Sequence, residues 1–505
     1  MNKKHILAAV LSLALMLSAC GAPQSGADTY AVPENAVEIR LSDEGVVVDG
    51  TPAGTDGTVY TANDIVYYES GKDITYGEGT EADAHSAAEA AAHTVVHITQ
   101  PGTYAITGSL SRGQIAVDLG EDAAEDPAAV VTLILNGVDI TCQVAPAVIF
   151  YNVYECGDAD GASWDVDTAA AGANVVIADG TVNTVSGSYV ARIYRSDSVV
   201  LNEDGTAVEE AKKLHKYDGA FYSRMSMNLE GGTGVLNIHA DNEGLDSEFH
   251  LTVNGGVINI FSGNDGINTN EDGVSVTTVN GGTLSVTVTG ETGEGDGIDS
   301  NGWLVINGGT VIASACASSA DAGIDSDMGI HINGGTVIAA GHMLDRIEDS
   351  GQTYAVFSFA GEQQSEDEIS LKNESGESVM DVSLPNSYSV LLVSGGELVP
   401  GTYTLWSGGE QLAGQNGGMA GDRGMGMPGG AEPPEGTERP EGTEPPEGME
   451  RPEGGEPPEG MEPPEDGRGG FGPGGFAPGG NAGDRTAEFE IGEGGNQFSG
   501  VGQME

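Results

Sequence analysis

Short runs of alternating apolar and polar residues recur along the chain from residue 37 onward. Residues 37–41, 95–98 and 103–107 alternate in this way, which is typical of β-strands with one buried face. Residues 130–135 are continuously apolar, the pattern of a strand buried on both faces. The Ala-rich residues 81–93 predict a helical turn or two, and the polar residues 154–172 and 202–218 predict loops. We therefore expect an all-β chain.

Two glycine-containing turns repeat between residues 228 and 341. The first contains a Gly-Gly pair and occurs at residues 230–232, 254–256, 280–282, 307–309 and 333–335, so its copies lie 24, 26, 27 and 26 residues apart. The second has the form Gly-Leu-Asp-Ser or Gly-Ile-Asp-Ser, with Asn and Thr in one copy, and occurs at residues 244–247, 266–269, 297–300 and 323–326. Each repeat thus contains two short β runs separated by tight turns.

A repeat of this length cannot bury its own apolar face, but stacked repeats share a continuous core. The pattern therefore predicts a parallel β-helix, a solenoid with irregular end caps, in which equivalent residues lie about 4.8 Å apart. Two columns are expected: an apolar one of Val253, Val279, Ile306 and Ile332, and a ladder of Asn254, Asn280, Asn307 and Asn333. A β-sandwich with chance glycine turns is the alternative, and the near-constant spacing argues against it.

The beginning of the chain predicts an exported lipoprotein. Lys3 and Lys4 precede an apolar run at residues 6–16, which is too short to span a bilayer as a helix. The sequence Leu-Ser-Ala-Cys at 17–20 has the form of a bacterial lipobox, which predicts cleavage before Cys20 and a lipid on its thiol. An ordinary secretory signal with a chance cysteine is the alternative. We expect a signal peptide at 1–20, a tether at 21–35 and an extracytoplasmic domain at 36–412, held at the cell-surface membrane only through Cys20.

The C-terminal region changes character. Residues 413–483 are rich in Gly, Pro and Glu and include six consecutive hexads between 432 and 467. This composition predicts a disordered, extended spacer, because it offers no side chains for a core. Within the last segment, 484–505, residues 487–491 alternate again. They predict a closing strand that would return to the end cap and make the spacer a large loop.

Charge narrows the range of partners. The chain has 78 acidic and 18 basic residues, a formal net charge of −60. Such a charge excludes nucleic acid and anionic membrane surfaces as direct partners, and it repels acidic glycans unless a cation intervenes. Cys142, Cys156 and Cys316 remain besides Cys20. The spacing of the first two fits no zinc site, which leaves structural thiols or one disulfide.

Acidic residues gather at the second repeated turn. Stacked carboxylates about 5 Å apart repel when both are ionised, so one must bind a proton or a cation must lie between them. A hard cation with oxygen ligands suits this arrangement, and calcium is the expected one outside the cell. The candidate ligands are Asp246, Asp265, Asn268, Asp296, Asp299, Asp321, Asp325 and Asp327, with Glu243 beside the first of them. The alternative is that these residues are solvated turn formers.

Several motifs upstream of the repeats carry a family resemblance. They are residues 102–104 (Gly-Thr-Tyr), 108–110 (Gly-Ser-Leu), 113–115 (Gly-Gln-Ile) and 133–140, and the alternating Gly-Ile-Asp and Asn-Gly-Gly turns follow them. With these features, residues 37–406 resemble the carbohydrate-binding β-helix domain of clostridial surface lipoproteins. The resemblance implies a right-handed parallel β-helix, structural calcium, and binding of cellulose or of pectin-type polymers such as polygalacturonate. The chain departs from that pattern by the insertion at 154–172 and by Asn268, where other coils have Asp.

Binding without cleavage is the function that these features favour. Lyases on this fold generally need a basic residue beside the uronate, and no Lys or Arg lies between residues 225 and 345. Only Arg192, Arg195 and Lys212 could reach the coils from loops. Trp303, at the start of a predicted strand, is a candidate for stacking on sugar rings, with a core position as the alternative. A polysaccharide lyase, a glycoside hydrolase with two positioned carboxyls, and a calcium-dependent adhesin or scaffold remain alternatives.

Overall fold

The computed structural model describes residues 30–157, 161–348, 350–365, 367–416 and 485–503. Nearly all regular structure is β, as expected. Helical turns are confined to α1 (Ala87–Ala90) and the 3-10 helix η1 (Glu121–Glu125) among the described residues. Helix α1 lies inside the predicted helical segment, and Ser86 and Glu89 cap its N-terminus reciprocally. The sheets are mixed, with long parallel ladders in the centre and antiparallel strands at both ends.

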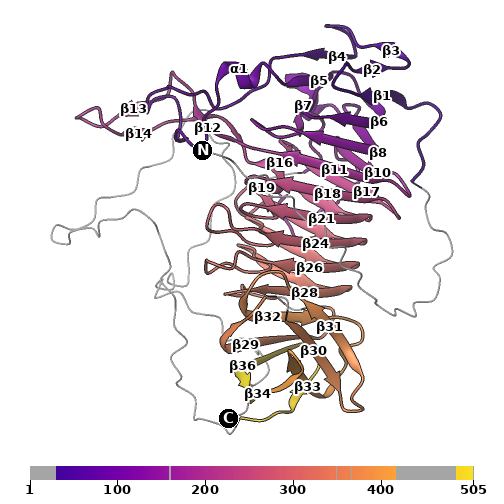
Figure 1. Cartoon of the computed structure of the whole chain (residues 1–505), viewed down its shortest axis with the longest axis vertical. Helices are drawn as coiled ribbons and strands as arrows, with labels where there is room; N and C mark the ends of the chain where they lie inside the picture. Colours follow the sequence, from indigo (N-terminus) through magenta and orange to yellow (C-terminus); the bar gives the residue numbers. More distant parts are fainter. Residues whose placement is uncertain (1–29, 158–160, 349, 366, 417–484, 504–505) are drawn as a thin grey trace, which may run out of the picture.

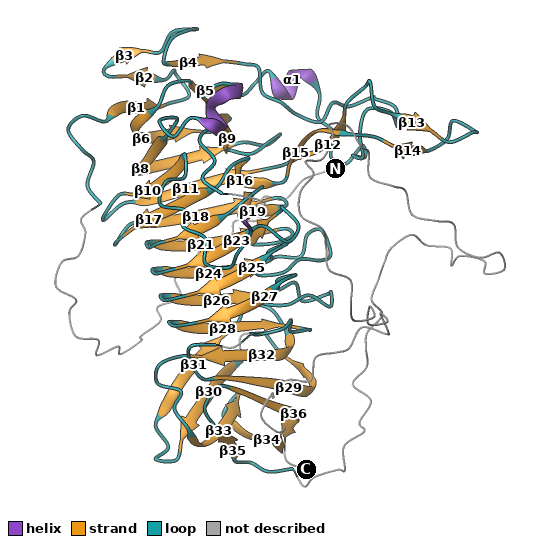
Figure 2. Ribbon diagram, turned by 180° about the vertical axis from the view of Figure 1, so that it is seen from behind, coloured by secondary structure: helices purple, strands orange, loops and turns teal. Residues whose placement is uncertain are grey.

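The centre consists of three columns of strands that stack along the long axis (Figures 1 and 2). The first column runs in parallel through β6 (Gly102–Leu110), β8 (Val131–Thr141), β10 (Ala173–Ile177), β17 (Met227–Gly231), β20 (Leu251–Val253), β23 (Val276–Val279), β25 (Trp303–Ile306) and β27 (Gly329–Ile332). The second continues from the end of β8 through β11 (Val182–Gly187), β18 (Val235–Ala240), β21 (Val257–Ser262), β24 (Thr283–Val288), β26 (Thr310–Ser314) and β28 (Thr336–Gly341).

The third column contains the Gly-Ile-Asp turns. It runs through β4 (Val59–Ala62), β5 (Thr94–Ile98), β7 (Gly113–Asp118), β9 (Val148–Asn152), β16 (Gly219–Ser223), β19 (Glu243–Ser247) and β22 (Ile267–Thr269), and only the β4–β5 pair is antiparallel. Single parallel bridges from Ile267 to Ile298 and from Ile298 to Ile324 extend it by two coils. The apolar residues of all three columns meet in one buried core.

Both predicted columns are present. Val253 lies opposite Val279, which lies opposite Ile306, and Ile306 lies opposite Ile332; all four side chains are buried. Asn254, Asn280, Asn307 and Asn333 form a hydrogen-bonded ladder in which each amide donates to the preceding side-chain carbonyl at 2.9 Å. The repeat spacing thus predicted the register of the coils.

Antiparallel strands close both ends. At the N-terminal end β1 (Val37–Leu41) pairs with β6 and with β2 (Val47–Val48), which pairs with β3 (Thr51–Pro52). The C-terminal cap has a separate apolar core, formed by β29 (Tyr354–Gln363), β30 (Glu368–Asn373), β31 (Ser378–Ser383), β32 (Tyr388–Ser394), β33 (Gly401–Ser407), β34 (Glu410–Asn416), β35 (Phe489–Ile491) and β36 (Gly495–Gln503). β35 pairs with β33, and β36 pairs with β29 and β34, so the last described residues pack in the cap.

One loop prediction is wrong. Residues 202–218 contain β14 (Val208–Glu210) and β15 (Lys213–Tyr217), which pair with β13 (Val200–Leu201) and β12 (Val190–Tyr194). These four strands form an arm that projects from the side of the coils (Figure 1). Residues 202–218 are rich in acidic and basic side chains, so their composition resembles that of a loop, although Val200, Leu201 and Leu214 of the arm are exposed. Its pairing is local and antiparallel, and polarity alone gives no sign of it.

Other predictions concern thiols and the two ends of the chain. Cys142, Cys156 and Cys316 are free thiols in the described part of the chain, and no disulfide joins them. The signal peptide, Cys20, most of the tether at 21–35 and nearly all of the spacer at 413–483 lie outside the described residues. No helix within the described ranges is long and apolar enough to cross a membrane.

Candidate functional site

Stacked glycines bring the second repeated turn of successive coils into close contact. A Cβ atom on Gly266 would lie 2.0 Å from Cγ1 of Val286 and 2.5 Å from the carbonyl oxygen of Gly297. Gly244 and Gly297 are equally confined, by the carbonyl oxygens of Gly266 and Gly323. Only glycine fits at these positions, so the coils can approach each other and the acidic residues that follow the glycines are aligned.

The residues predicted to form an acidic column do lie in one column. Asp246 pairs in register with Asn268. The bridges at Ile267, Ile298 and Ile324 then place Asp299 and Asp325 in the next two coils. Asp246 is buried, whereas Asp299 and Asp325 are partly exposed. The structure therefore brings four of the eight predicted ligands into one line.

The other predicted aspartates take different positions. Asp265 and Asp296 each accept a hydrogen bond from the next coil, at 2.7 Å from the amide of Asp296 and at 2.5 Å from that of Ala322. Asp321 accepts from the amide of Gly295 at 2.5 Å. One oxygen of each side chain thus connects neighbouring coils. Asp327 is exposed and lies two residues beyond the column.

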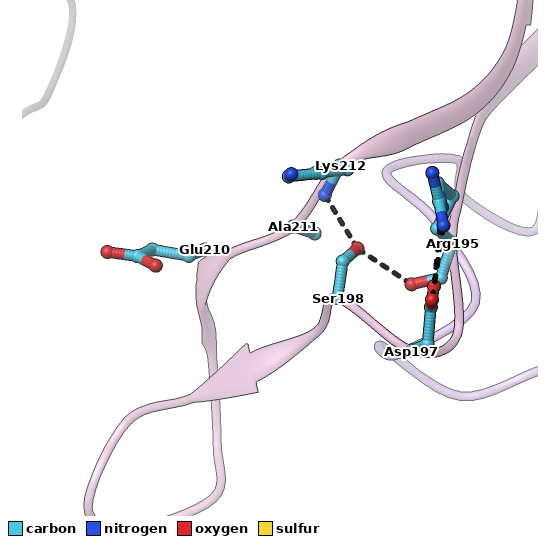
Figure 3. Close-up of a pocket in the computed structure, with 6 residues that line it drawn as sticks. All are labelled: Arg195, Asp197, Ser198, Glu210, Ala211 and Lys212. Carbon is cyan, nitrogen blue, oxygen red and sulfur yellow. Dashed lines mark hydrogen bonds and ion pairs between the residues drawn. The ribbon is translucent and has the colours of Figure 1, made fainter. Parts of the chain in front are cut away.

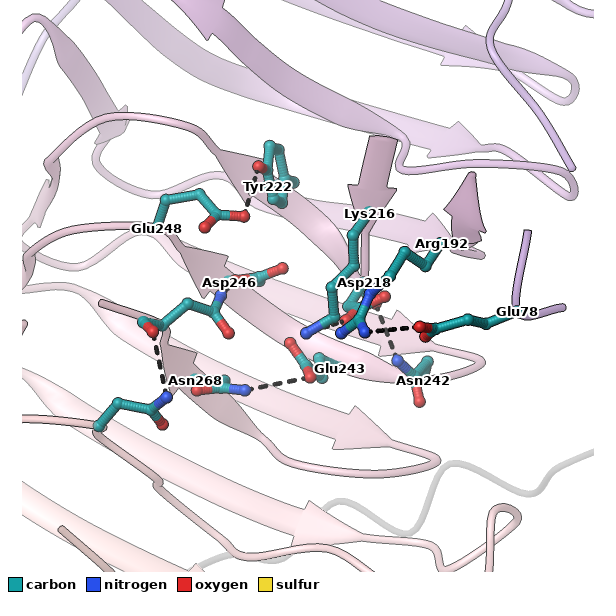
Figure 4. A network of polar contacts seen from close by, with 12 residues as sticks. Glu78, Arg192, Lys216, Asp218, Tyr222, Asn242, Glu243, Asp246, Glu248 and Asn268 are labelled. Carbon is teal, nitrogen blue, oxygen red and sulfur yellow. Dashed lines mark hydrogen bonds and ion pairs between the residues drawn. The ribbon is translucent and has the colours of Figure 1, made fainter. Parts of the chain in front are cut away.

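A polar network covers the upper end of the column (Figure 4). Nδ2 of Asn268 donates to Oε1 of the buried Glu243 at 3.1 Å. The second carboxylate oxygen of Glu243 and Oδ1 of Asn268 are buried without a hydrogen-bond partner in the described structure. Each of these oxygens is therefore in a desolvated position, where an unpaired acceptor is costly.

The arm supplies the cations of this network. The sequence indicated that Arg192 could reach the coils, but it did not connect Lys216 with them. Nζ of Lys216 lies 2.8 Å from Oδ2 of Asp218, and Nη1 of Arg192 lies 2.9 Å from Oε1 of Glu78. Figure 4 shows Lys216 and Arg192 beside Asp218 and Glu243. In the sequence, the one connection between Lys216 and the column is that Asp218, two residues later, immediately precedes strand β16.

Burial and like charge raise the pKa values of these carboxyls. Burial, then the neighbouring carboxylates, raise the pKa of Glu243, Asp246 and Asp265 well above the ordinary range. The same causes raise the pKa of Asp296 to about 8, of Asp325 to about 7 and of Asp299 to about 6. These carboxyls therefore keep their protons to a higher pH than exposed carboxyls do, unless a cation replaces the protons.

The chemistry of the column suits a hard cation, although its geometry is not a compact metal site. Oxygen donors, mutual repulsion and the unpaired oxygens of Glu243 and Asn268 fit an ion such as calcium. No cluster of three or more His, Cys, Asp or Glu side chains in the described ranges is arranged to hold a metal. The carboxylates are instead spread over several coils, so an ion would have to draw ligands from adjacent turns.

The candidate sugar-stacking residue lies outside the core. Trp303 is partly exposed at the start of β25, while Leu304 and Ile306 of the same strand are buried. A second tryptophan was missed: Trp164, from the inserted loop, stacks on His331 with ring centroids 4.7 Å apart and is 42% exposed. The loop predicted at 154–172 thus lies along the first column, where the hydroxyl of Thr168 is 2.7 Å from that of Thr252.

The arm also forms an open pocket (Figure 3). Arg195 pairs there with Asp197 at 3.1 Å, and the hydroxyl of Ser198 accepts from the backbone amide of Lys212 at 2.8 Å. All three basic residues that could reach the coils from loops, Arg192, Arg195 and Lys212, therefore lie on the arm, and both arginines are paired with carboxylates.

Comparison with known proteins gives one family match. A family described as carbohydrate-binding domain-containing protein matches residues 92–383. No curated protein matches the chain. Among solved structures, a gadolinium derivative of the polysaccharide lyase-like protein from C. thermocellum is similar at 19% identity, with a TM-score of 0.35, covering 63% of this chain and 92% of that one.

Proposed function

The chain belongs to the family of carbohydrate-binding domain-containing proteins, and from this membership we propose that it binds polysaccharide without cleaving it. The family match carries the proposal, because residues 92–383 include the repeated coils, the acidic column and all of the network that covers it except Glu78. We propose further that the stacked coils are a right-handed parallel β-helix. Such a fold presents a long, regular surface to a long, regular polymer.

The positions of the basic residues support a non-catalytic role. A lyase needs a base that is neutral at working pH. Burial lowers the pKa of Lys216, but Asp218, Glu243 and Asp246 raise it by more, so the net shift is upward and the amine stays protonated. Arg192 and Arg195 are paired with carboxylates. No Lys or Arg lies on the coils between residues 225 and 345.

Calcium is proposed as the cofactor of the column. Four of the proposed ligands share one line: Asp246, Asn268, Asp299 and Asp325. The other four are Asp265, Asp296, Asp321 and Asp327. The ion would neutralise the carboxylates and offer positive charge to a uronate. This would allow a chain of net charge −60 to bind an acidic polymer such as polygalacturonate, and cellulose-type glycans would need no such ion.

The proposed location is the outer face of the cell membrane. The lipobox-like residues 17–20 support a lipid on Cys20, and this lipid would be the only contact with the membrane. The spacer at 413–483 would then be a long polar loop between two strands of the cap. Trp303, at the surface of the first column, is proposed to contact the glycan.

The experiment is a pull-down with a chain that starts at residue 21, using insoluble pectate, cellulose and xylan, each in calcium and in EDTA. Unsaturated uronates and new reducing ends are measured in the same tubes. Retention without products supports the proposal, and loss of pectate retention in EDTA supports the calcium column. Release of either product would replace it with a lyase or a hydrolase, and absence of retention on every polymer would refute polysaccharide binding.

A further inference from the structure

The outward face of the second column differs from the rest of this acidic chain. Its outward side chains form three rows across the strands: Val182, Val235, Val257, Thr283, Thr310 and Thr336; Thr184, Asn237, Asn259, Ser285, Ile312 and Ile338; and Ser186, His239, Phe261, Thr287, Ser314 and Ala340. None of these positions, all within the described ranges, holds Asp, Glu, Lys or Arg. With a net charge of −60 over the chain, an uncharged strip six strands long is a distinct surface.

The middle of the strip presents an aromatic platform. The rings of His239 and Phe261 stack with centroids 5.2 Å apart and planes 10° apart. Phe261 remains 39% exposed, and His239 is exposed as well. Burial lowers the pKa of His239, so its ring is neutral at neutral pH. An exposed ring pair that is already stacked between neighbouring strands offers an apolar surface that does not need to reorganise on binding.

Amides lie beside this platform. Nδ2 of Asn259 donates to Oδ1 of Asn237 at 2.9 Å, which orients both side chains along the row. In the described structure Nδ2 of Asn237 and Oδ1 of Asn259 make no hydrogen bond, so one donor and one acceptor remain. Ser285 and Thr287 add hydroxyls in the next coil. The exposed asparagine ladder from Asn254 to Asn333 lies at the turn before the first row and extends the uncharged polar surface.

The ends of the strip are defined. The cap covers Ile338 and Ala340, and Ile312 packs against the same cap core, so the open part ends at β26. At the other end the uncharged strip stops at β8, because Asp139 of β8 lies opposite Thr184 and carries a negative charge. The open part thus spans the strands from β11 to β26, which are stacked in the centre of Figure 1.

We propose that this strip binds a neutral, cellulose-type polysaccharide, with pyranose rings on Phe261 and His239 and with sugar hydroxyls on Asn237, Asn259 and Ser285. Rings and amides without charge are the groups that recognise a neutral sugar, since one face of the ring is apolar and its rim carries hydroxyls. A polymer crossing the strands would follow these rows and meet a new strand about every 4.8 Å. The inference rests on the proposed function and adds a second, cation-independent site to it.

The test uses the chain from residue 21 and titrates hydroxyethylcellulose and cello-oligosaccharides in EDTA. Phe261→Ala should weaken binding by about tenfold or more, the effect of losing a central aromatic contact. Phe261→Tyr should retain it, because the ring is kept. Val399→Ala is the matched control: Val399 is 55% exposed in the C-terminal cap, outside the strip, and should leave affinity unchanged.

Other outcomes separate this inference from the proposed function. Equal affinity of Phe261→Ala and wild type for the glucan would overturn the strip and leave polysaccharide binding intact. Calcium-dependent retention on pectate with no affinity for any neutral glucan would do the same. Absence of binding to every polymer would remove the proposed function itself. Self-association that Phe261→Ala abolishes, without glucan binding, would assign the strip to a contact between copies and overturn the inference.

Discussion

The side-chain amide of Asn268 donates to Oε1 of Glu243 across 3.1 Å, and both residues are buried at the upper end of the acidic column. Asn268 occupies the place that Asp takes in the neighbouring coils. At this position a third carboxylate would face Glu243 and Asp246, whose pKa values burial and mutual repulsion already raise. The amide therefore explains the one departure from the Gly-x-Asp repeat.

Replacing this amide tests its role. Asn268→Asp should lower the free energy of unfolding at neutral pH in EDTA by on the order of 2 to 4 kcal/mol, because it adds a buried charge next to two acids. Chemical denaturation measures the change. Asn280→Asp in the exposed ladder is the control and should cost much less. Calcium should reduce the loss in Asn268→Asp, and equal stability of variant and wild type in EDTA would contradict the account.

The column should make stability depend on pH when divalent cations are removed. Asp296, Asp325 and Asp299 have folded-state pKa values of about 8, 7 and 6, all above the value of about 3.9 in an unfolded chain. Between pH about 4 and about 8 the folded state therefore binds more protons than the unfolded chain does. The stability that these groups contribute is fully present below pH of about 4 and is lost as the pH rises toward about 8. Melting temperature against pH in EDTA measures this.

Two further results qualify that pH profile. Asp296→Asn should flatten it, most of all in its upper part, because this carboxyl has the highest of the three values. Calcium should raise the melting temperature more at pH 8 than at pH 5, since it competes with protons for the same oxygens. A melting temperature in EDTA that rises steadily from pH 5 to pH 8 would contradict the raised pKa values of these carboxyls.

The arm should stabilise the column through Lys216. Lys216→Met removes the cation 2.8 Å from Asp218 while keeping much of the side-chain volume. The expected loss is below the roughly 3–5 kcal/mol of a fully buried pair, because 28% of the Lys216 side chain is exposed. Lys72→Met, at an exposed pair with Glu69, is the control and should cost under about 1 kcal/mol. A Lys216→Met variant that loses no more stability than this control would show that the arm does not stabilise the column through Lys216.

Close stacking of the glycine turns can be tested directly. Gly266→Ala would place a Cβ 2.0 Å from Val286, so the coils must shift apart. We expect a loss of about 1–3 kcal/mol or more in the free energy of unfolding, as for overpacked cores. Gly361→Ala, with no atom within 4 Å of the added carbon, should leave stability nearly unchanged. Equal melting temperatures for the two variants would contradict the close approach.

The repeat was predictable because its information is local. Fixed spacing between Gly-Gly turns determines which residues stack, so the Val253 to Ile332 column and the asparagine ladder follow from counting residues. The line from Asp246 to Asp325 follows for the same reason. The mixed sheets at the ends do not repeat, and their strand pairing could not be derived from spacing.

The parts that the sequence did not predict depend on contacts between distant segments. Lys216 reaches the column because an antiparallel arm folds back before β16, and nothing in the polar residues 202–218 indicates that pairing. Trp164 meets His331 across a separation that no periodicity describes. The pairing of Phe261 with His239 follows from the repeat spacing, since both are outward residues of neighbouring strands with one register.

The central claim, binding without cleavage, is tested most directly by one calorimetric titration of the chain from residue 21 with polygalacturonate and with a soluble β-glucan, followed by measurement of the recovered polymer's length. The account predicts saturable heat for at least one polymer, loss of the polygalacturonate signal in EDTA, and full-length polymer after prolonged incubation. Shortened polymer, or no heat with either glycan, would contradict it.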